Sequence, residues 1–273
     1  MSLFRHSAIG LGVSLDHIAA AVPTNDTGSW RVQSVPLPEI SRETLTHVLD
    51  SLLQGHTGSR RRVHSVFAPE TLREWVMDVP AGVQSLAELR TLATARFTQL
   101  YGLAPDAWTI AADWTPRGPM LCTAAPTGLL ETLGYELARR GLKHSVSTML
   151  CRALSDISAL PNDAWLCIRT HRSLSLLLIR GRSLQILRTL RTAAADQSHQ
   201  LETVIAEMNR ARLRSGFTAA QRLHWYDCSQ GQLCQTAVGG VEIVPISSRI
   251  LQRIDSVASD ADSCAAACMG AVL

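Results

Sequence analysis

The sequence contains few aromatic and few charged residues. Of its 273 residues, 5% are Phe, Trp or Tyr and 18% are Asp, Glu, Lys or Arg, whereas 46% are hydrophobic. This composition is typical of a globular chain and excludes an intrinsically disordered one. The formal net charge of +3 is too small to indicate a nucleic-acid-binding protein, so we expect no nucleic acid as a partner.

Long hydrophobic runs are also missing. The longest, LSLLLI at residues 174–179, is far shorter than the roughly 20 residues that a transmembrane helix needs. The opening MSLFRHSAIGLGVSL has no hydrophobic stretch with a small-residue cleavage site, so it does not predict a signal peptide. We therefore expect a cytoplasmic protein without direct membrane insertion.

The sequence motifs of several enzyme classes and metal sites are absent. There is no Gly-x-x-x-x-Gly-Lys-Ser/Thr P-loop and no Gly-x-Ser-x-Gly or Ser-x-x-Lys nucleophile motif. Cys264 and Cys268 have the spacing of one helix face, but no second pair of ligands accompanies them. The seven cysteines therefore predict reduced, buried thiols and no metal site: Cys122, Cys151, Cys167, Cys228, Cys234, Cys264 and Cys268.

What the sequence does contain is one plan of strands and helices that occurs twice. Alternating apolar residues predict three consecutive strands within residues 8–36 and three more within 164–190, and a helix follows each set. Between the sets, Ser85 and Glu88 form a capping box at the start of a strong helix, and PETLREWVMDVP at residues 69–80 predicts a short one. This order predicts an α/β fold of two similar halves, each with a mixed sheet.

This plan resembles the actin-like superfamily of actin, sugar kinases and Hsp70. More narrowly, it resembles PilM of type IV pilus machines and the cytoplasmic part of the type II secretion protein GspL. The resemblance covers nearly the whole chain, and its clearest segments are GLGVSLDHIAAAV, VFAPETLREWVMDVP, SLAELRTLATARFTQLYGLAPDAWTIAADW, MLCTAAPTGLLETLGYELARRGLKHSVSTMLCRAL and CMGAVL.

The resemblance implies a duplicated RNase H-like, two-domain fold. It places the first half at residues 1–142, with an inserted subdomain at about 60–118. The second half then spans residues 143–273, and its terminal helix packs back against the sheets. Because little sequence separates the helix that ends near Gly216 from the strands after it, we expect the second-half insertion to be reduced.

Active members of the superfamily carry Asp-x-Gly in each of two phosphate hairpins. The Asp orients hydrated Mg²⁺ or the attacking water, and the Gly lets backbone N–H groups approach phosphate. The resemblance places Ser14 and Asp16 at these positions in the first hairpin, and Arg169 and His171 in the second. Neither a serine nor an arginine replaces a carboxylate at a metal. In the second hairpin, side chains that simply point to solvent are an equally good interpretation.

A Gly-Gly pair completes this interpretation. The resemblance places Gly239 and Gly240 where actin-like proteins have a turn against adenosine, while the residues alone favour a turn that needs positive φ. We therefore expect a degenerate nucleotide pocket with no metal and no cofactor, and at most weak ATP binding.

The resemblance implies a scaffold protein that is a pseudo-ATPase. It also implies that the protein is peripheral to the inner membrane, where a partner protein holds it. The implied partners are the tail of a PilN-like bitopic inner-membrane protein and components of a pilus or secretion motor. We expect the strand with Val63, Val66 and Phe67 to accept this tail as an added strand, with Trp75 as an anchor or as a core residue. The alternative function is an active actin-like ATPase or small-molecule kinase.

Overall fold

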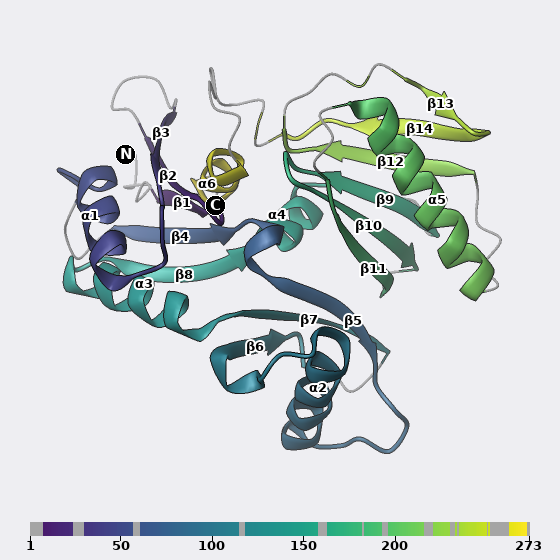
Figure 1. Ribbon diagram of the computed structural model, residues 1–273, viewed down its shortest axis with the longest axis horizontal. Helices are drawn as coiled ribbons and strands as arrows, with labels where there is room; N and C mark the ends of the chain where they lie inside the picture. Colours follow the sequence, from purple (N-terminus) through teal and green to yellow (C-terminus); the bar gives the residue numbers. More distant parts are fainter. Residues whose placement is uncertain are drawn as a thin grey trace, which may run out of the picture.

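A computed structural model shows three sheets and six helices among the residues that it describes (Figure 1). The described residues are 8–23, 30–56, 61–114, 118–157, 163–181, 183–192, 196–215, 221–229, 233, 235–249, 251 and 262–271. No helix in these ranges is long and apolar enough to cross a membrane. Six cysteines are free thiols, and Cys234 lies outside the described residues.

The first sheet has five strands in the order β3-β2-β1-β4-β8. Strands β1, β2 and β3 form an antiparallel meander, and β4 and β8 continue the sheet in parallel with β1. Helices α1 and α3 pack on one face of this sheet, where they bury Leu45, Leu49 and Leu133. Its elements are β1 Ile9–Val13, β2 His17–Pro23, β3 Trp30–Pro36, α1 Arg42–Leu52, β4 Arg62–Phe67, α3 Thr127–Arg139 and β8 Lys143–Thr148.

The second sheet repeats this plan, with the order β11-β10-β9-β12-β14-β13. An antiparallel meander of β9, β10 and β11 is again followed by parallel strands, β12 and β14, which confirms the predicted duplication. Helix α5 covers one face and α4 the other. The elements are α4 Met149–Asp156, β9 Ala164–Arg169, β10 Ser173–Arg180, β11 Ser183–Arg191, α5 Gln197–Ser215, β12 Arg222–Asp227, β13 Ala237–Val238 and β14 Val241–Ile246.

A third sheet, in the order β5-β7-β6, forms the inserted subdomain below the first sheet in Figure 1. Helix α2 packs on it and buries Leu89, Ala93 and Phe97 against Trp75. The predicted capping box of Ser85 and Glu88 is present. The elements are β5 Arg73–Asp78, α2 Leu86–Tyr101, β6 Trp108–Ala112 and β7 Pro119–Pro126, with single 3₁₀ turns at Pro69–Thr71 and Pro105–Ala107.

The prediction of a helix at residues 69–80 is wrong. After the turn at Pro69–Thr71, the chain forms β5, which pairs antiparallel with β7. Trp75 and Met77 lie two residues apart and both enter the core under α2, which is the period of a strand. Pairing with a strand distant in sequence therefore overrides the local helical pattern.

The subdomain bounds also differ from those expected from the sequence. Strand β4, inside the predicted insertion of about 60–118, belongs to the first sheet, and the inserted sheet runs from Arg73 to Pro126. Strand β8 begins at Lys143, beyond the predicted boundary at residue 142, yet it pairs with β4. Between the described strands and helices of the second sheet we find no comparable inserted sheet.

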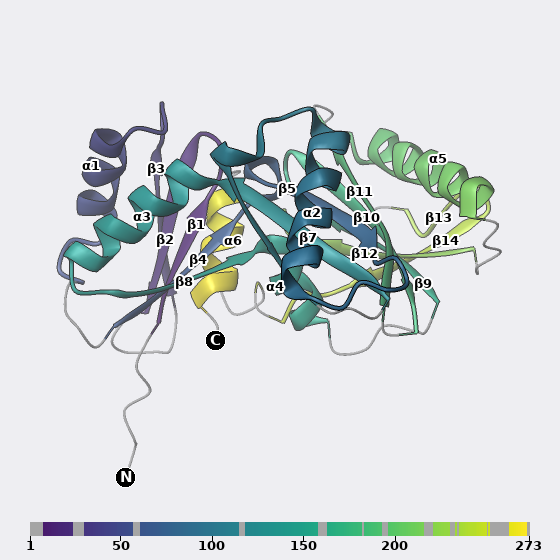
Figure 2. The ribbon, with the colours of Figure 1, turned by 90° about the horizontal axis from the view of Figure 1, so that it is seen from below.

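The terminal helix α6, Asp262–Ala271, lies against β1, β2 and β4, on the face of the first sheet away from α1 and α3 (Figure 2). Its side chains are mostly small, so the helix backbone comes very close to the sheet. A Cβ added at Gly10 would lie 1.8 Å from the Ala267 carbonyl oxygen, and one at Gly270 would lie 2.5 Å from that of His64. This close packing fixes α6 on the first half.

Candidate functional site

The hairpin between β1 and β2 uses its polar side chains to close its own turn. The Ser14 hydroxyl is buried, donates to the His17 carbonyl at 3.0 Å and accepts from the His17 N–H at 3.2 Å. The Asp16 carboxylate contacts His17 Nδ1 at 3.0 Å and the Arg172 guanidinium of the other hairpin. Partial burial opposes ionisation, but hydrogen bonds from His17 and Arg172 outweigh it and lower the pKa of Asp16.

The hairpin between β9 and β10 turns at Thr170, His171 and Arg172. The buried Thr170 hydroxyl accepts from the N–H groups of Ser173 at 3.0 Å and Arg172 at 3.3 Å. The N–H groups of His171 and Arg172 also point at the Asp262 carboxylate, which begins α6. The two hairpins therefore meet through Asp16 and Arg172, with Asp262 beside them.

Arg169 does not face this meeting point. Its guanidinium donates to Asp227 at 2.7 Å, to Ser229 at 2.6 Å and to Gln200 at 2.8 Å, and it is 12% exposed. The charge of Arg169 is therefore neutralised within the second half, by a carboxylate on the neighbouring strand β12. The sequence of β9 alone does not predict that Asp227 on β12 pairs with Arg169.

Gly239 and Gly240 do not lie near the hairpins. They form the turn between β13 and β14, both with positive φ, as the residues alone predict. This turn precedes β14, whereas the hairpin follows β9. Because β9, β12 and β14 run parallel, the two turns lie at opposite ends of the second sheet. The prediction that the pair lies at a nucleotide pocket with the second hairpin is wrong.

The residues around the hairpins do not fit a Mg²⁺-nucleotide site. Ser14 closes a turn, Asp16 is paired with Arg172, and Arg169 is paired with Asp227. Across the described part of the chain, no group of three or more His, Cys, Asp or Glu side chains could hold a metal ion. Because Asp16 and Asp227 are each paired with an arginine, neither described hairpin has a free carboxylate of the kind that orients Mg²⁺.

A groove of about 570 Å³ lies between the first sheet and the inserted sheet. Of the described strands, only β4 pairs with β8 and only β7 pairs with β6, so both walls end in strands with one free edge. Val146 on β8 is 48% exposed and lines the groove. The lining is mostly apolar, with Phe67, Leu72, Leu121, Ala125, Leu130 and Val146.

The polar residues of the lining are Thr109, Asp113, Thr123, His144, Ser147 and Thr148. His144 Nε2 lies 2.8 Å from the Ser65 hydroxyl, and burial, with the charge of His64, lowers the pKa of His144 to about 4. Burial also raises the pKa of the Cys151 thiol. Near pH 7 the imidazole is neutral and the thiol protonated, and Asp113 is the acidic side chain of the lining, so the groove suits a mainly apolar segment better than an anion.

The residues predicted to receive a partner are only partly in this groove. Strand β4 pairs with β1 on one side and β8 on the other, so it has no free edge and cannot accept an added strand. Val63 and Val66 belong to β4 and are fully buried, and Trp75 is a core residue under α2. Phe67 does line the groove. Of these two strands, β8 rather than β4 has an edge without a pairing partner among the described strands.

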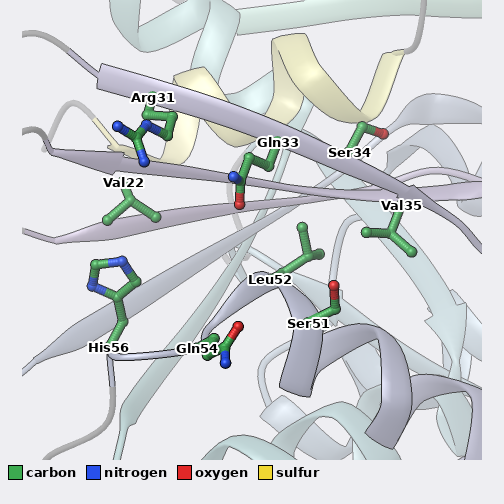
Figure 3. Close-up of a pocket in the computed structure, with 9 residues that line it drawn as sticks. All are labelled: Val22, Arg31, Gln33, Ser34, Val35, Ser51, Leu52, Gln54 and His56. Atoms are coloured by element: carbon green, nitrogen blue, oxygen red, sulfur yellow. The ribbon is translucent and has the colours of Figure 1, made fainter.

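A second hollow, of about 580 Å³, lies between β2, β3 and the end of α1. Arg31 and Gln33 face His56 and Gln54 across it (Figure 3). The His56 ring accepts from Arg61 Nη1 at 2.6 Å, and burial and the charges of Arg61 and Arg31 lower its pKa. This hollow is lined mainly by polar side chains and the groove beside β8 mainly by apolar ones, so we place the candidate site in that groove.

No family model matches the chain, and no curated protein matches its sequence. Solved structures do match. The cytoplasmic domain of EpsL, an inner-membrane component of the type II secretion system of Vibrio cholerae, is similar with a TM-score of 0.56 and 11% identity, over 90% of this chain and 91% of that one.

Two other structures match to a similar degree. The PilM-PilN type IV pilus biogenesis complex aligns with a TM-score of 0.55 and 14% identity, over 98% of this chain and 96% of that one. A Bacteroides thetaiotaomicron protein with an actin-like ATPase fold and unknown function has a TM-score of 0.56 and 8% identity. This match covers 91% of this chain and 95% of that one. The chain therefore has the actin-like fold, in the form shared with PilM and GspL, as its sequence predicted.

Proposed function

We propose that this protein is a non-enzymatic assembly component of a type II secretion or type IV pilus machine. It binds an extended cytoplasmic tail of an inner-membrane partner in the groove between β8 and β6. The observation that carries this proposal is the groove itself, which is mainly apolar and has, among the described strands, an unpaired strand edge on each wall. The similarity to structures described as a PilM-PilN complex and as an inner-membrane secretion component supports the type of machine and of partner.

The free edge of β8 gives the tail its main-chain partners. A tail that enters as an added strand would take the unpaired N–H and C=O groups of β8, and alternate side chains would enter the apolar lining around Phe67 and Val146. Ordering the tail costs conformational entropy, so a single short segment should bind with micromolar affinity. Such affinity suits a scaffold whose contacts with a machine are reinforced by other subunits.

Placing a charge in the groove is expected to abolish capture of the tail. Val146→Arg keeps the strand, because charged residues are well tolerated on an edge, but it puts a guanidinium against the apolar lining. We expect the Kd for a fluorescein-labelled peptide of the PilN-like partner tail to rise at least about tenfold. Fluorescence anisotropy measures this change.

Leu213→Arg is the matched control, because Leu213 is 87% exposed on α5, outside the groove. It should bind the peptide as the unaltered protein does. If Val146→Arg binds the peptide with unchanged Kd, the groove is not the docking site and this part of the proposal is wrong.

The protein is expected not to hydrolyse Mg-ATP. Both hairpins lack a free carboxylate to orient the metal, because Asp16 is paired with Arg172 and Asp227 with Arg169. Phosphate release should therefore equal that of a buffer blank, and isothermal titration with Mg-ATP should detect weak binding or none. Micromolar, Mg²⁺-dependent binding would instead favour an active actin-like ATPase or small-molecule kinase.

A further inference from the structure

The turn of the second hairpin holds a carboxylate of the same chain. His171 N–H donates to Asp262 Oδ1 at 2.6 Å, and Arg172 N–H donates to Asp262 Oδ2 at 3.3 Å. Each oxygen therefore takes one of two consecutive backbone donors. Asp262 is 3% exposed, so water does not share these contacts to any large extent.

Consecutive N–H groups that point into one turn form a concave site for an anion, because their partial positive charges converge. Here the donors belong to His171 and Arg172, and the Arg172 side chain adds a full charge beside them. A bidentate carboxylate and a phosphate present the same chemistry to such a turn, namely two oxygens of one anion. From this geometry we propose that the second hairpin is an oxyanion site that the chain fills with its own Asp262.

The surrounding charges keep any other anion out. Asp16 accepts from the Arg172 side chain, and Glu70 lies close enough to Asp262 and Arg172 to interact with both charges. A free phosphate would therefore meet the repulsion of Asp16 and Asp262 as well as an occupied turn, and Glu70 adds to this repulsion where it ionises, above about pH 7. Removing Asp262 both empties the turn and lowers this repulsion.

The occupied site also joins the two halves. Helix α6 packs on β1, β2 and β4 of the first sheet, and its first residue binds the hairpin of the second sheet. The ion pair between Asp16 and Arg172 crosses the same junction. Asp262 thereby holds the halves together without a ligand, independently of whether the groove binds a partner tail.

The test is a phosphate titration of Asp262→Ala. Urea unfolding is followed with inorganic phosphate from 0 to about 20 mM, with sodium chloride adjusted to constant ionic strength. The unaltered protein gives the general salt effect of phosphate on stability. Asp262→Ala should show an additional, saturable rise in its unfolding midpoint, and at ten times the phosphate Kd its folded-to-unfolded ratio should rise about elevenfold.

Two further variants make the result specific. Glu39→Ala removes one carboxylate from an exposed position and should respond as the unaltered protein does. Asp262→Asn keeps one acceptor oxygen and should show a smaller phosphate effect than Asp262→Ala. If a variant at residue 262 unfolds without phosphate, the same titration reads the recovery of its folded fraction. The proposal is overturned if neither variant gains more from phosphate than the unaltered protein does.

Discussion

Replacing Gly10 by alanine is expected to destabilise the protein by about 3 kcal/mol or more. Gly10 lies in β1, and a Cβ there would stand 1.8 Å from the Ala267 carbonyl oxygen and 2.5 Å from the Ala271 nitrogen. Both are backbone atoms of α6, so no side-chain rotation relieves the clash. The helix has to move away from β1, β2 and β4 together, which opens the buried contacts of Ala19, Ala21, Cys264 and Ala267.

Equilibrium unfolding in urea, monitored by tryptophan fluorescence and circular dichroism, measures this loss. Gly134→Ala is the matched control, because Gly134 lies within α3 and nothing is within 4 Å of a Cβ added there. Alanine has the higher helix propensity, so this control should gain about 0.5–1 kcal/mol. A Gly10→Ala variant as stable as the unaltered protein would show that α6 does not pack on β1 this closely.

Replacing Glu70 by glutamine is expected to stabilise the protein at neutral and higher pH. Glu70 is 5% exposed in the turn after β4, and among the described residues neither of its carboxylate oxygens has a hydrogen-bond partner. Burial and the nearby charge of Asp262 raise its pKa from 4.5 to about 7, although Arg172 acts in the opposite direction. Ionising this carboxyl in the folded state is therefore unfavourable.

The sign of the pH dependence follows from the pKa of Glu70 in the folded chain and in the unfolded chain. Between pH 4.5 and about 7, the unfolded chain releases the Glu70 proton while the folded chain keeps it, so this carboxyl lowers the free energy of unfolding as pH rises. Glu70→Gln removes this loss. At pH 4.5 the variant should nearly match the unaltered protein, and at pH 8 it should be more stable by about 3 kcal/mol.

Urea unfolding at pH 4.5, 6, 7 and 8 tests this expectation, and the exposed Glu39→Gln serves as the control with a change below about 0.5 kcal/mol at every pH. Glu74 also makes the free energy of unfolding fall as pH rises. Burial raises its pKa to about 7, and its Oε1 lacks a hydrogen-bond partner among the described residues. Glu70→Gln should therefore reduce the pH dependence without removing it. A variant with the slope of the unaltered protein would mean that Glu70 is ionised in the folded state.

Local patterns in the sequence were sufficient for most elements and for the duplication. Alternating apolar residues in two meanders identified β1 to β3 and β9 to β11, and Ser85 with Glu88 identified the start of α2. These signals are local, because side-chain period and end capping depend on residues within a few positions of one another. The order of the elements then carried the resemblance to the actin-like superfamily.

Part of the degenerate hairpins was also visible in the sequence. The absence of Asp-x-Gly at Ser14 and Asp16 follows directly from the residues, and so does the turn at Gly239 and Gly240. What these residues contact did not follow from them. Asp16 pairs with Arg172 and Arg169 pairs with Asp227, and in each pair the partners are at least 58 residues apart in the sequence.

Tertiary structure alone decided which strand edges are free, which carboxylate enters a turn and which segments pair. Strand β4 has a suitable apolar sequence, but β1 and β8 pair with both of its edges, so among these described strands the unpaired edge is that of β8. The segment at residues 73–78 became a strand because β7 offered it backbone partners. Asp262 reached His171 because small residues let α6 lie against β1. Each outcome depends on hydrogen-bond partners and packing partners distant in the chain, which no local pattern of residues encodes.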